Sequence, residues 1–451
     1  FICKTYVEGI FDWNKLHNLY TVLVKLRMKF NKSIWSWSLY DWANSAFSTT
    51  VMAGFFPIFF EKYWSNPDDV IQSTFVLGMG NALASIIVAA LAPFLGAIAD
   101  RGSAKKRFLF IFALMGILTT GGLWMVGQGD WEMAMFLYIL ATIGFMGGNI
   151  FYDALLPSIS TEKTVDTVSS FGFALGYIGG GLLFLINVLM YQNPNWFGIS
   201  NPETAIKLSF LSVGVWWGIF TLPILLFVDE PKHANQIPLH RAFFQAWVEL
   251  KKTLVDIKSL KMTALFLLAY WLYIDGVDTI IKMAVKMGSN LGFGTSTLIT
   301  ALLMVQFIAF PAALAYNWFA SKIGTKKAIQ IAIGGYAVAT FLGTFMVDEV
   351  HFYGLAALIG LFQGGLQALS RSLFSRLIPL GKEGEFFGFY NMLGKFAAVI
   401  GPVMMGWVTL VTENARMGIF SILLLFIAGS FLLSKVDMEE GAKMAKAFGT
   451  K

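Results

Sequence analysis

The sequence predicts an all-helical protein that crosses a membrane many times. Of its 451 residues, 57% are hydrophobic and 13% are charged, and the mean hydropathy is +0.66. Soluble domains carry about 25% charged residues. Apolar runs of about 20 residues, the length that spans a bilayer as a helix, recur along the whole chain. These runs lack the alternation of membrane barrel strands and are about twice as long. The lipid bilayer is therefore the expected surrounding of most of the fold.

Twelve apolar segments are long enough to span the membrane, and they define the predicted helices in chain order. Pro57, Pro93, Pro311 and Pro402 lie within four of them and predict kinks there. The segments cover residues 34–60, 71–99, 107–127, 133–157, 168–191, 205–228, 262–284, 297–319, 327–347, 352–375, 386–410 and 415–434.

Lysine and arginine lie mainly at one end of the predicted bundle. If the even-numbered loops and both ends of the chain are placed on one side, that side holds 26 of the 33 Lys and Arg residues. Because cytoplasmic loops are enriched in Lys and Arg, both ends of the chain are expected in the cytoplasm. This topology accounts for the net charge of +6, and no nucleic-acid partner is expected.

A polar stretch over residues 229–261 divides the spans six and six. The residues before the first span contain one short apolar patch that Lys25 interrupts, which is neither a signal peptide nor a span. We expect Met28 to be the natural start of the chain. The predicted parts are a cytoplasmic extension (1–33), an N-terminal six-helix half (34–228), a cytoplasmic linker (229–261), a C-terminal six-helix half (262–434) and a cytoplasmic tail (435–451).

Three short matches between the halves indicate an internal duplication. They occupy corresponding places in the two sets of six spans, which favours parallel repeats related by an axis along the membrane normal. The matched segments are 96–106 with 317–327, 171–173 with 387–389, and 41–44 with 275–278.

The loop over residues 96–106 resembles the signature loop of major facilitator transporters, with a Gly, three residues, an Asp-Arg pair and a basic run. It carries Ser103 and Ala104 where Gly and Arg are usual. The chain more closely resembles one branch of that superfamily, which contains the fungal autophagy-related vacuolar effluxer and many bacterial homologues. Four stretches carry this resemblance: Leu-Tyr-Asp-Trp-Ala-Asn-Ser-Ala-Phe at 39–47, Gly-Phe-Ala-Leu-Gly-Tyr-Ile-Gly-Gly at 172–180, Gln-Gly-Gly-Leu-Gln-Ala-Leu-Ser-Arg-Ser at 363–372, and Glu-Phe-Phe-Gly-Phe-Tyr at 385–390 followed by Gly394-Lys395.

The resemblance implies a secondary transporter with spans 1, 4, 7 and 10 around a central cavity. It implies a small-molecule substrate, with amino acids suggested by the fungal member. It also implies a bacterial inner membrane, or a vacuolar membrane if the source is eukaryotic. We expect a monomer. The sequence does not decide between a coupling proton, a coupling sodium ion and uniport.

Two pairs of polar residues occupy corresponding spans of the two halves. Asp41 and Asn44 lie three residues apart on span 1, and Asp275 and Asp278 lie three apart on span 7. Each pair therefore shares one helix face. Because a charge at mid-membrane costs about 2.5 to 3.5 kcal/mol on insertion scales, each aspartate needs a partner or a water-filled cavity. These faces suit a cation or an ammonium group.

A second polar group lies on spans 10 and 11. Gln363, Gln367 and Arg371 share one side of span 10, and Lys395 lies on span 11. A guanidinium group can bind a carboxylate through two hydrogen bonds. The hypothesis is a zwitterion bound between Arg371 and one or more aspartates, with Lys395 assisting or neutralising an aspartate. The alternative is a set of interhelical ion pairs that only stabilises the bundle.

Three charged residues lie at the cytoplasmic ends of spans 2 and 4, too shallow for a central site. They are Asp100, Arg101 and Asp153, and we expect them to form a gate. Asp100 is expected to contact the positively polarised start of span 11. Asp153 is expected to pair with Arg101 or Arg107.

Glycines cluster in spans 4 and 5. Gly172 and Gly176 form a small-xxx-small face that favours close helix packing.

Other classes of protein lack their signatures in this chain. Tyr40-Asp41 resembles half of an intramembrane aspartyl protease dyad, but no Gly-x-Gly-Asp follows. The chain also lacks a zinc His-Glu-x-x-His motif, a Gly-x-Ser-x-Gly nucleophile turn and a nucleotide-binding loop. It has one cysteine and four histidines, none of them within an apolar run, so no enzyme activity, metal site or cofactor is expected. The remaining alternatives are a transporter of a cationic or quaternary-amine solute, or a lipid translocator or receptor on the same scaffold, which an apolar lateral opening would favour.

Overall fold

The computed structural model describes residues 31–66, 70–230 and 260–449, with short stretches between 241 and 253. Most of the predicted extension and linker lies outside the described residues. A helix covers each of the twelve predicted spans. The first span runs continuously through α3 (Lys32–Ala46), η1 (Phe47–Phe55), α4 (Phe56–Phe59) and η2 (Phe60–Trp64). The other spans are α5 (Val70–Gly102), α6 (Lys105–Gly122), α7 (Trp131–Ala154), α9 (Val165–Gln192), α10 (Pro202–Phe227), α12 (Lys261–Asn290), α13 (Thr295–Ile323), α14 (Thr325–Gly343), α15 (Glu349–Ser375), α16 (Glu383–Thr412) and, for the last, α17 (Ala415–Ser421) with α18 (Leu423–Ser434).

Ten of the described helices are long and apolar enough to cross a membrane. The first span and α14 complete a set consistent with the twelve predicted. Several helices begin where a side chain accepts a hydrogen bond from a first-turn amide. These N-terminal caps are Asn31, Asp130, Asn201 and Asp348. In the first span, η1 and η2 are π-helical, a winding that is frequent at functional sites and that hydropathy does not predict.

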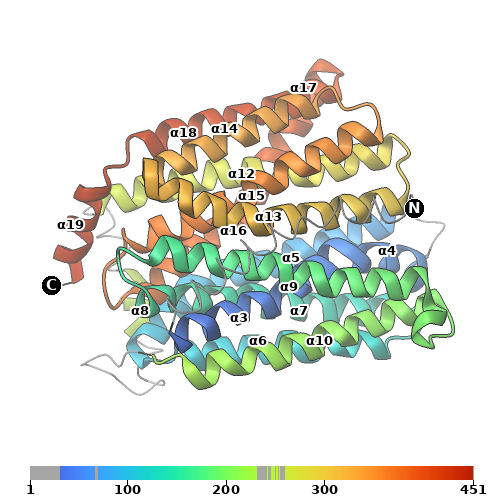
Figure 1. Ribbon diagram of the computed structural model, residues 1–451, viewed down its shortest axis with the longest axis horizontal. Coiled ribbons are helices and arrows are strands. Elements are labelled where there is room, and N and C mark those ends of the chain that lie inside the picture. Colours follow the sequence, from blue (N-terminus) through green and yellow to red (C-terminus); the bar gives the residue numbers. More distant parts are fainter. Residues whose placement is uncertain are drawn as a thin grey trace, which may run out of the picture.

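The helices form two bundles that lie side by side, each with its own core (Figure 1). Buried residues of the first six spans make one set of apolar clusters, including Trp37, Phe56 and Trp217. Nearly all buried residues of the other large cluster belong to the last six spans, including Tyr273 and Tyr336. The fold is therefore the predicted pair of six-helix halves.

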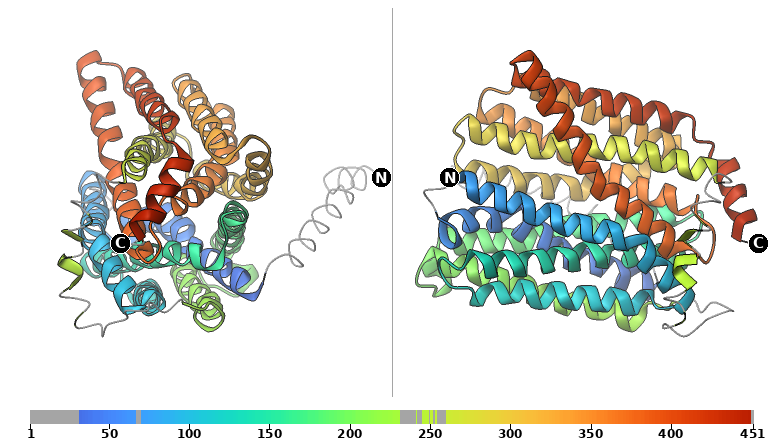
Figure 2. Two further views of the ribbon diagram at one scale, coloured as in Figure 1. Left: turned by 90° about the vertical axis from the view of Figure 1, so that its left-hand side faces the viewer. Right: turned by 180° about the vertical axis from the view of Figure 1, so that it is seen from behind.

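The two halves meet mainly through α5 with α16, and through α9 with α13 and α15. The start of α16 packs against α5, whereas its end lies beside α17, so this helix runs obliquely across the bundle (Figure 2). The close contact needs glycine, because a Cβ atom on Gly96 of α5 would collide with the Gly384 carbonyl of α16. A Cβ atom on Gly388 would likewise lie 2.6 Å from the Ala92 carbonyl oxygen.

One end of the molecule carries the loop between α5 and α6, the loop between α13 and α14, and the short helices α8 (Leu156–Ile159) and α19 (Met438–Gly449) (Figure 1, left). We call it the basic end, since both loops are rich in Lys and Arg. Its location in the cytoplasm stays a prediction from the distribution of these residues.

Candidate functional site

Arg371 lies on α15 between the two halves and is only 3% exposed. Its Nη1 atom lies 3.0 Å from Asp153 Oδ1 and 3.7 Å from Asp41 Oδ2. Its Nε and Nη2 atoms donate to the hydroxyl and carbonyl oxygens of Ser169, both at 3.0 Å. All these partners belong to the other half. We call Arg371, Asp41, Asp153 and Ser169 the Arg371 cluster.

Aromatic rings surround the guanidinium group of this cluster. It lies 4.2 Å from the ring centre of Phe173, 4.9 Å from that of Trp37 and 5.3 Å from that of Tyr152. Cations are attracted to such ring faces. Tyr152 also donates its hydroxyl to Asp41 Oδ2 at 3.1 Å. The rings exclude water, so the charges interact in a low-dielectric surrounding.

The two glycines predicted to bring helices together hold this cluster against α9. A Cβ atom on Gly172 would lie 2.7 Å from the Trp37 ring and 3.2 Å from Arg371 Nη2. A Cβ atom on Gly176 would lie 3.1 Å from Asp41 Oδ1. The close approach expected of this face is confirmed, and it provides room for both charged groups.

The predicted partner of Asp153 is wrong. Asp153 lies in the last turn of α7, but it pairs with Arg371 rather than with Arg101 or Arg107. Its second oxygen accepts from Asn391 of α16 at 3.1 Å. The long side chain of Arg371 reaches that turn of α7. The sequence gives the depth of each residue only along its own span, so it did not reveal this contact. Asp153 therefore belongs with the central charges.

Lys395, Asn44, Gln363 and Gln367 surround the cluster at greater distance. Lys395, from α16, acts electrostatically on Asp153. Asn44 donates to Asn149 of α7 at 2.5 Å. Gln367 accepts from the Tyr177 hydroxyl at 2.7 Å, and the side-chain oxygen of Gln363 is buried. These groups give the interior around Arg371 a polar lining.

Asp275 lies apart from the Arg371 cluster, at the contact of α12 with α16. Its side chain is fully buried, and both carboxylate oxygens lie 3.0 Å from the backbone nitrogen of Gly401. Thr279 donates to it as well. Since Gly401 precedes Pro402, which cannot donate within the helix, Asp275 stabilises α16 where the proline interrupts it. Asp278 is half-buried one turn further on.

The expected contact of Asp100 with the start of span 11 is present. Its two oxygens accept from the backbone amides of Gly384 and Glu385, each at 2.9 Å. Lys105 lies 3.0 Å from Asp100 and 2.8 Å from Glu383. Asp100 thus joins the last turn of α5 to the first turn of α16, where the helix dipole favours a negative charge. Arg101 is half-buried in the same turn of α5.

Sequence reasoning missed a second polar contact between the halves at the basic end. Arg376 pairs with Asp166 at 2.9 Å, and Lys446 of α19 pairs with Glu162 at 2.8 Å. Both acidic residues follow span 4 in a short polar stretch, which hydropathy assigns only as a loop. Together with the contacts of Asp100, these pairs join the two halves at the basic end.

The second half of α16, which lies farther from the basic end, differs from the buried start of this helix because it has exposed apolar side chains. Val403 is 67% exposed and Trp407 is 65% exposed. A shallow apolar depression on this helix is lined by Ile400, Val403, Met404 and Trp407.

Comparisons with known proteins agree with this arrangement. A family described as "Vacuole effluxer Atg22 like" matches residues 68–446. An uncharacterised major facilitator-type transporter of Bacillus subtilis, YxiO, is 36% identical, covering 93% of this chain and 98% of its own. Autophagy-related protein 22 of Eremothecium gossypii is 23% identical, and the match covers 91% of this chain and 92% of that protein.

Solved structures of major facilitator transporters share the fold. The proton:xylose symporter XylE has a TM-score of 0.69 at 13% identity and covers 92% of this chain and 98% of its own. The human organic anion transporter MFSD10 has a TM-score of 0.65 at 15% identity, and the match covers 89% of this chain and 99% of that transporter. Likeness at such low identity shows the fold alone. Taken with the family match, it shows that the chain belongs to the Atg22-like family of major facilitator transporters and is a multi-pass membrane protein, not an enzyme.

Proposed function

We propose that this transporter carries a small zwitterionic solute, an amino acid or a close relative, by alternating access. The observation that carries the proposal is the placement of Arg371. This buried guanidinium lies on the C-terminal half and is held by two carboxylates of the N-terminal half. A solute carboxylate can take the place of Asp153, because both present the same two-oxygen group to Arg371.

The two aspartates hold Arg371 unequally, which suggests different roles. Asp153 is the closer partner, and Asn391 also hydrogen-bonds to it. Asp41 lies 3.7 Å away and is bound by Tyr152. When a solute carboxylate displaces Asp153, Asn391 and Lys395 remain beside the displaced group. Asp41 is then the group best placed to bind a solute ammonium.

A zwitterion also suits the balance of charge in the site. Removing one partner of a buried ion pair leaves an uncompensated charge, which costs about 3 to 5 kcal/mol. A zwitterion brings one charge of each sign, so the site stays balanced when it is occupied. A solute with one charge does not have this property. Asp275 is no longer proposed as a primary ligand, since its oxygens already bind the backbone of α16.

The proposal is tested by replacing Arg371 in the full chain. Arg371→Lys keeps the charge but loses the planar group, so affinity for a zwitterionic amino acid should fall at least about tenfold. Arg371→Gln should abolish binding. Arg416→Lys, at an exposed position outside the site, is the matched control and should bind normally. Binding is measured by thermal shift across a panel of amino acids.

Normal affinity of Arg371→Gln for its solute would refute the zwitterion proposal. If the solute is a cation such as a quaternary amine, the order reverses. Asp41→Asn then becomes the damaging change, and Arg371→Lys is nearly silent. Lys395→Gln tests whether that lysine assists Arg371 in either case.

A lipid translocator is the second candidate, and one observation favours it. The apolar depression on α16 exposes Val403 and Trp407, whereas Ile400 and Met404 pack against the core of the C-terminal half, and exposed apolar side chains of this kind suit a lipid chain. Movement of a labelled phospholipid between leaflets, with no exchange of amino acids, would support this function. The buried charges around Arg371 favour the polar solute.

A further inference from the structure

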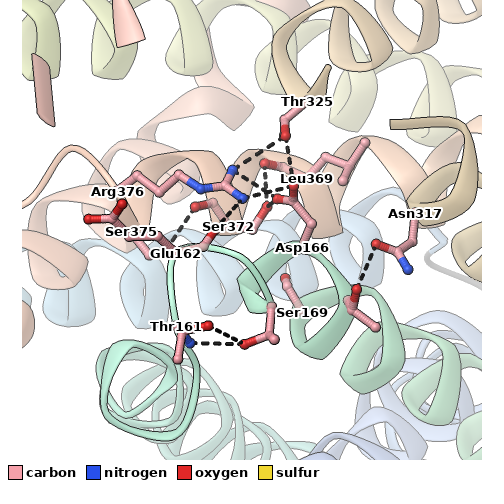
Figure 3. Close-up of polar contacts among 12 residues, drawn as sticks. Thr161, Glu162, Asp166, Ser169, Asn317, Thr325, Leu369, Ser372, Ser375 and Arg376 are labelled. Carbon is pink, nitrogen blue, oxygen red and sulfur yellow. Dashed lines mark hydrogen bonds and ion pairs between the residues drawn. The ribbon is translucent and has the colours of Figure 1, made fainter. Parts of the chain in front are cut away.

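Asp166 is the centre of a dense polar contact between the two halves (Figure 3). Its carboxylate accepts from Arg376 Nη1 at 3.0 Å and from Arg376 Nη2 at 2.9 Å. It also accepts from the hydroxyls of Ser372 at 2.5 Å and Thr325 at 2.7 Å. We call these four residues the Asp166 cluster. Its donors all come from the C-terminal half, whereas Asp166 belongs to the N-terminal half.

The positions of both ions within their helices strengthen this contact. Asp166 lies in the first turn of α9, and Arg376 is the C-terminal cap of α15. A negative charge is favoured at a helix start and a positive charge at a helix end. Arg376 also donates to the carbonyl of Glu162 at 3.1 Å. The two side chains are only about one fifth exposed and share two parallel hydrogen bonds, so the pair should stabilise the contact more than an ordinary surface pair does.

The Asp166 cluster lies next to the Arg371 cluster on the same two helices. Ser169, which binds Arg371, follows Asp166 by one turn of α9. Arg371 precedes Arg376 by five residues, a rise of about 7.5 Å along a helix. The helices α9 and α15 are thus joined by charged groups at two places, through Arg371 at the site and through the Asp166 cluster at the basic end, and neutral hydrogen bonds from Ser169 to the Ala368 carbonyl and from Tyr177 to Gln367 lie between the same helices. A movement of α9 relative to α15 that breaks one of the two charged contacts therefore also affects the other.

The internal duplication shows why this contact is needed. The match of segments 96–106 and 317–327 places Ser321 at the position of Asp100. The second half therefore has no aspartate in its corresponding loop. Ser321 donates to the Trp318 carbonyl within its own helix instead. The Asp166 cluster supplies a carboxylate at this second place from the helix that faces the loop.

We propose that the Asp166 cluster is a second gate that holds the basic end closed, and that α9 and α15 couple its opening to the occupancy of Arg371. A solute carboxylate that draws Arg371 away from Ser169 removes one of the two charged contacts between these helices. The Asp166 cluster is then the charged contact that remains between them. The coupling rests on the proposed function, whereas the gate does not.

The gate is tested without any solute. Spin labels are placed at Arg107→Cys and Lys327→Cys, two exposed positions at the basic ends of opposite halves, in a Cys3→Ser background that removes the single cysteine of the sequence. Asp166→Asn should raise the ratio of open to closed molecules roughly tenfold, because a charged partner of Arg376 is lost. The exchange Asp166→Arg with Arg376→Asp should restore part of the closed population.

Thr167→Val is the matched control, because Thr167 makes a neutral hydrogen bond to Asn317 between the same halves. It should change the distance distribution little. If Asp166→Asn fails to fold, Arg376→Lys provides the test, since it keeps the charge but loses the two parallel bonds. Distances in either variant that match those of the parent overturn the gate.

The coupling has a separate readout. Arg371→Lys, without solute, weakens the hold on Ser169 and should also raise the open fraction. A variant that loses solute binding but keeps the parent distances would overturn the coupling and leave the proposed function intact. A variant with raised opening and normal solute affinity would support the coupling and refute the proposed role of Arg371.

Discussion

Replacing Asp100 by Asn isolates the contact between α5 and α16. The carboxylate accepts from two backbone amides at 2.9 Å and pairs with Lys105 at 3.0 Å. Asparagine keeps the shape but offers one acceptor oxygen, so one amide loses its partner and the other bonds to a neutral group. Hydrogen bonds to charged groups contribute about 1.5 to 3 kcal/mol and neutral ones about 0.5 to 1.5 kcal/mol. Lys105 keeps its contact with Glu383.

The closed state should therefore lose about 2 to 3 kcal/mol in Asp100→Asn, which is a roughly 30- to 150-fold shift towards opening at the basic end. Distances between labels at Arg107→Cys and Lys327→Cys measure this shift. Asp130→Asn is the control, because Asp130 also caps a helix start but at the opposite end and within one half. A distance distribution in Asp100→Asn equal to that of the parent would refute the reasoning.

Two further predictions concern the packing of α16. Gly96→Ala should separate α5 from α16 and raise the open fraction, since its Cβ atom would collide with the Gly384 carbonyl; Gly78→Ala, on the same helix with open space around it, should have no effect. Equal distances in the two variants would contradict the packing argument. Asp275→Asn should lower thermal stability by about 1 to 3 kcal/mol through the lost bond to Gly401, while solute affinity stays normal. If Asp275→Asn loses solute binding but keeps its thermal stability, Asp275 is a residue that binds the solute.

The helices and the Asp100 contact could be predicted because each follows from a local rule. Apolar runs of spanning length identify helices without knowledge of their neighbours. Asp100 could be assigned because a helix start attracts a carboxylate whatever its side chains are. Gly172 and Gly176 were likewise informative, since small residues four apart form a face that permits close approach. In each case the prediction needs only the residue's own helix pattern and not the identity of its partner side chains.

The charge partners could not be predicted because they depend on helix rotation and tilt. Asp275 turns towards the backbone of α16, and an apolar helix carries no pattern that indicates this direction. Asp153 reaches Arg371 because the arginine side chain extends towards the basic end. Asp166 and Arg376 lie in loops by hydropathy, where charged residues are common, so nothing in the sequence distinguished them. These contacts appear only when the two halves are packed together.

Counterflow in proteoliposomes tests the central claim most directly. Purified protein is reconstituted with an unlabelled metabolite inside, and uptake of labelled neutral amino acids, quaternary amines and sugars is followed for the parent, Arg371→Gln and Arg416→Lys. The account predicts saturable exchange of one or more zwitterionic amino acids by the parent and by Arg416→Lys, and none by Arg371→Gln. Exchange of cations or sugars alone, or amino-acid exchange that survives in Arg371→Gln, would contradict it.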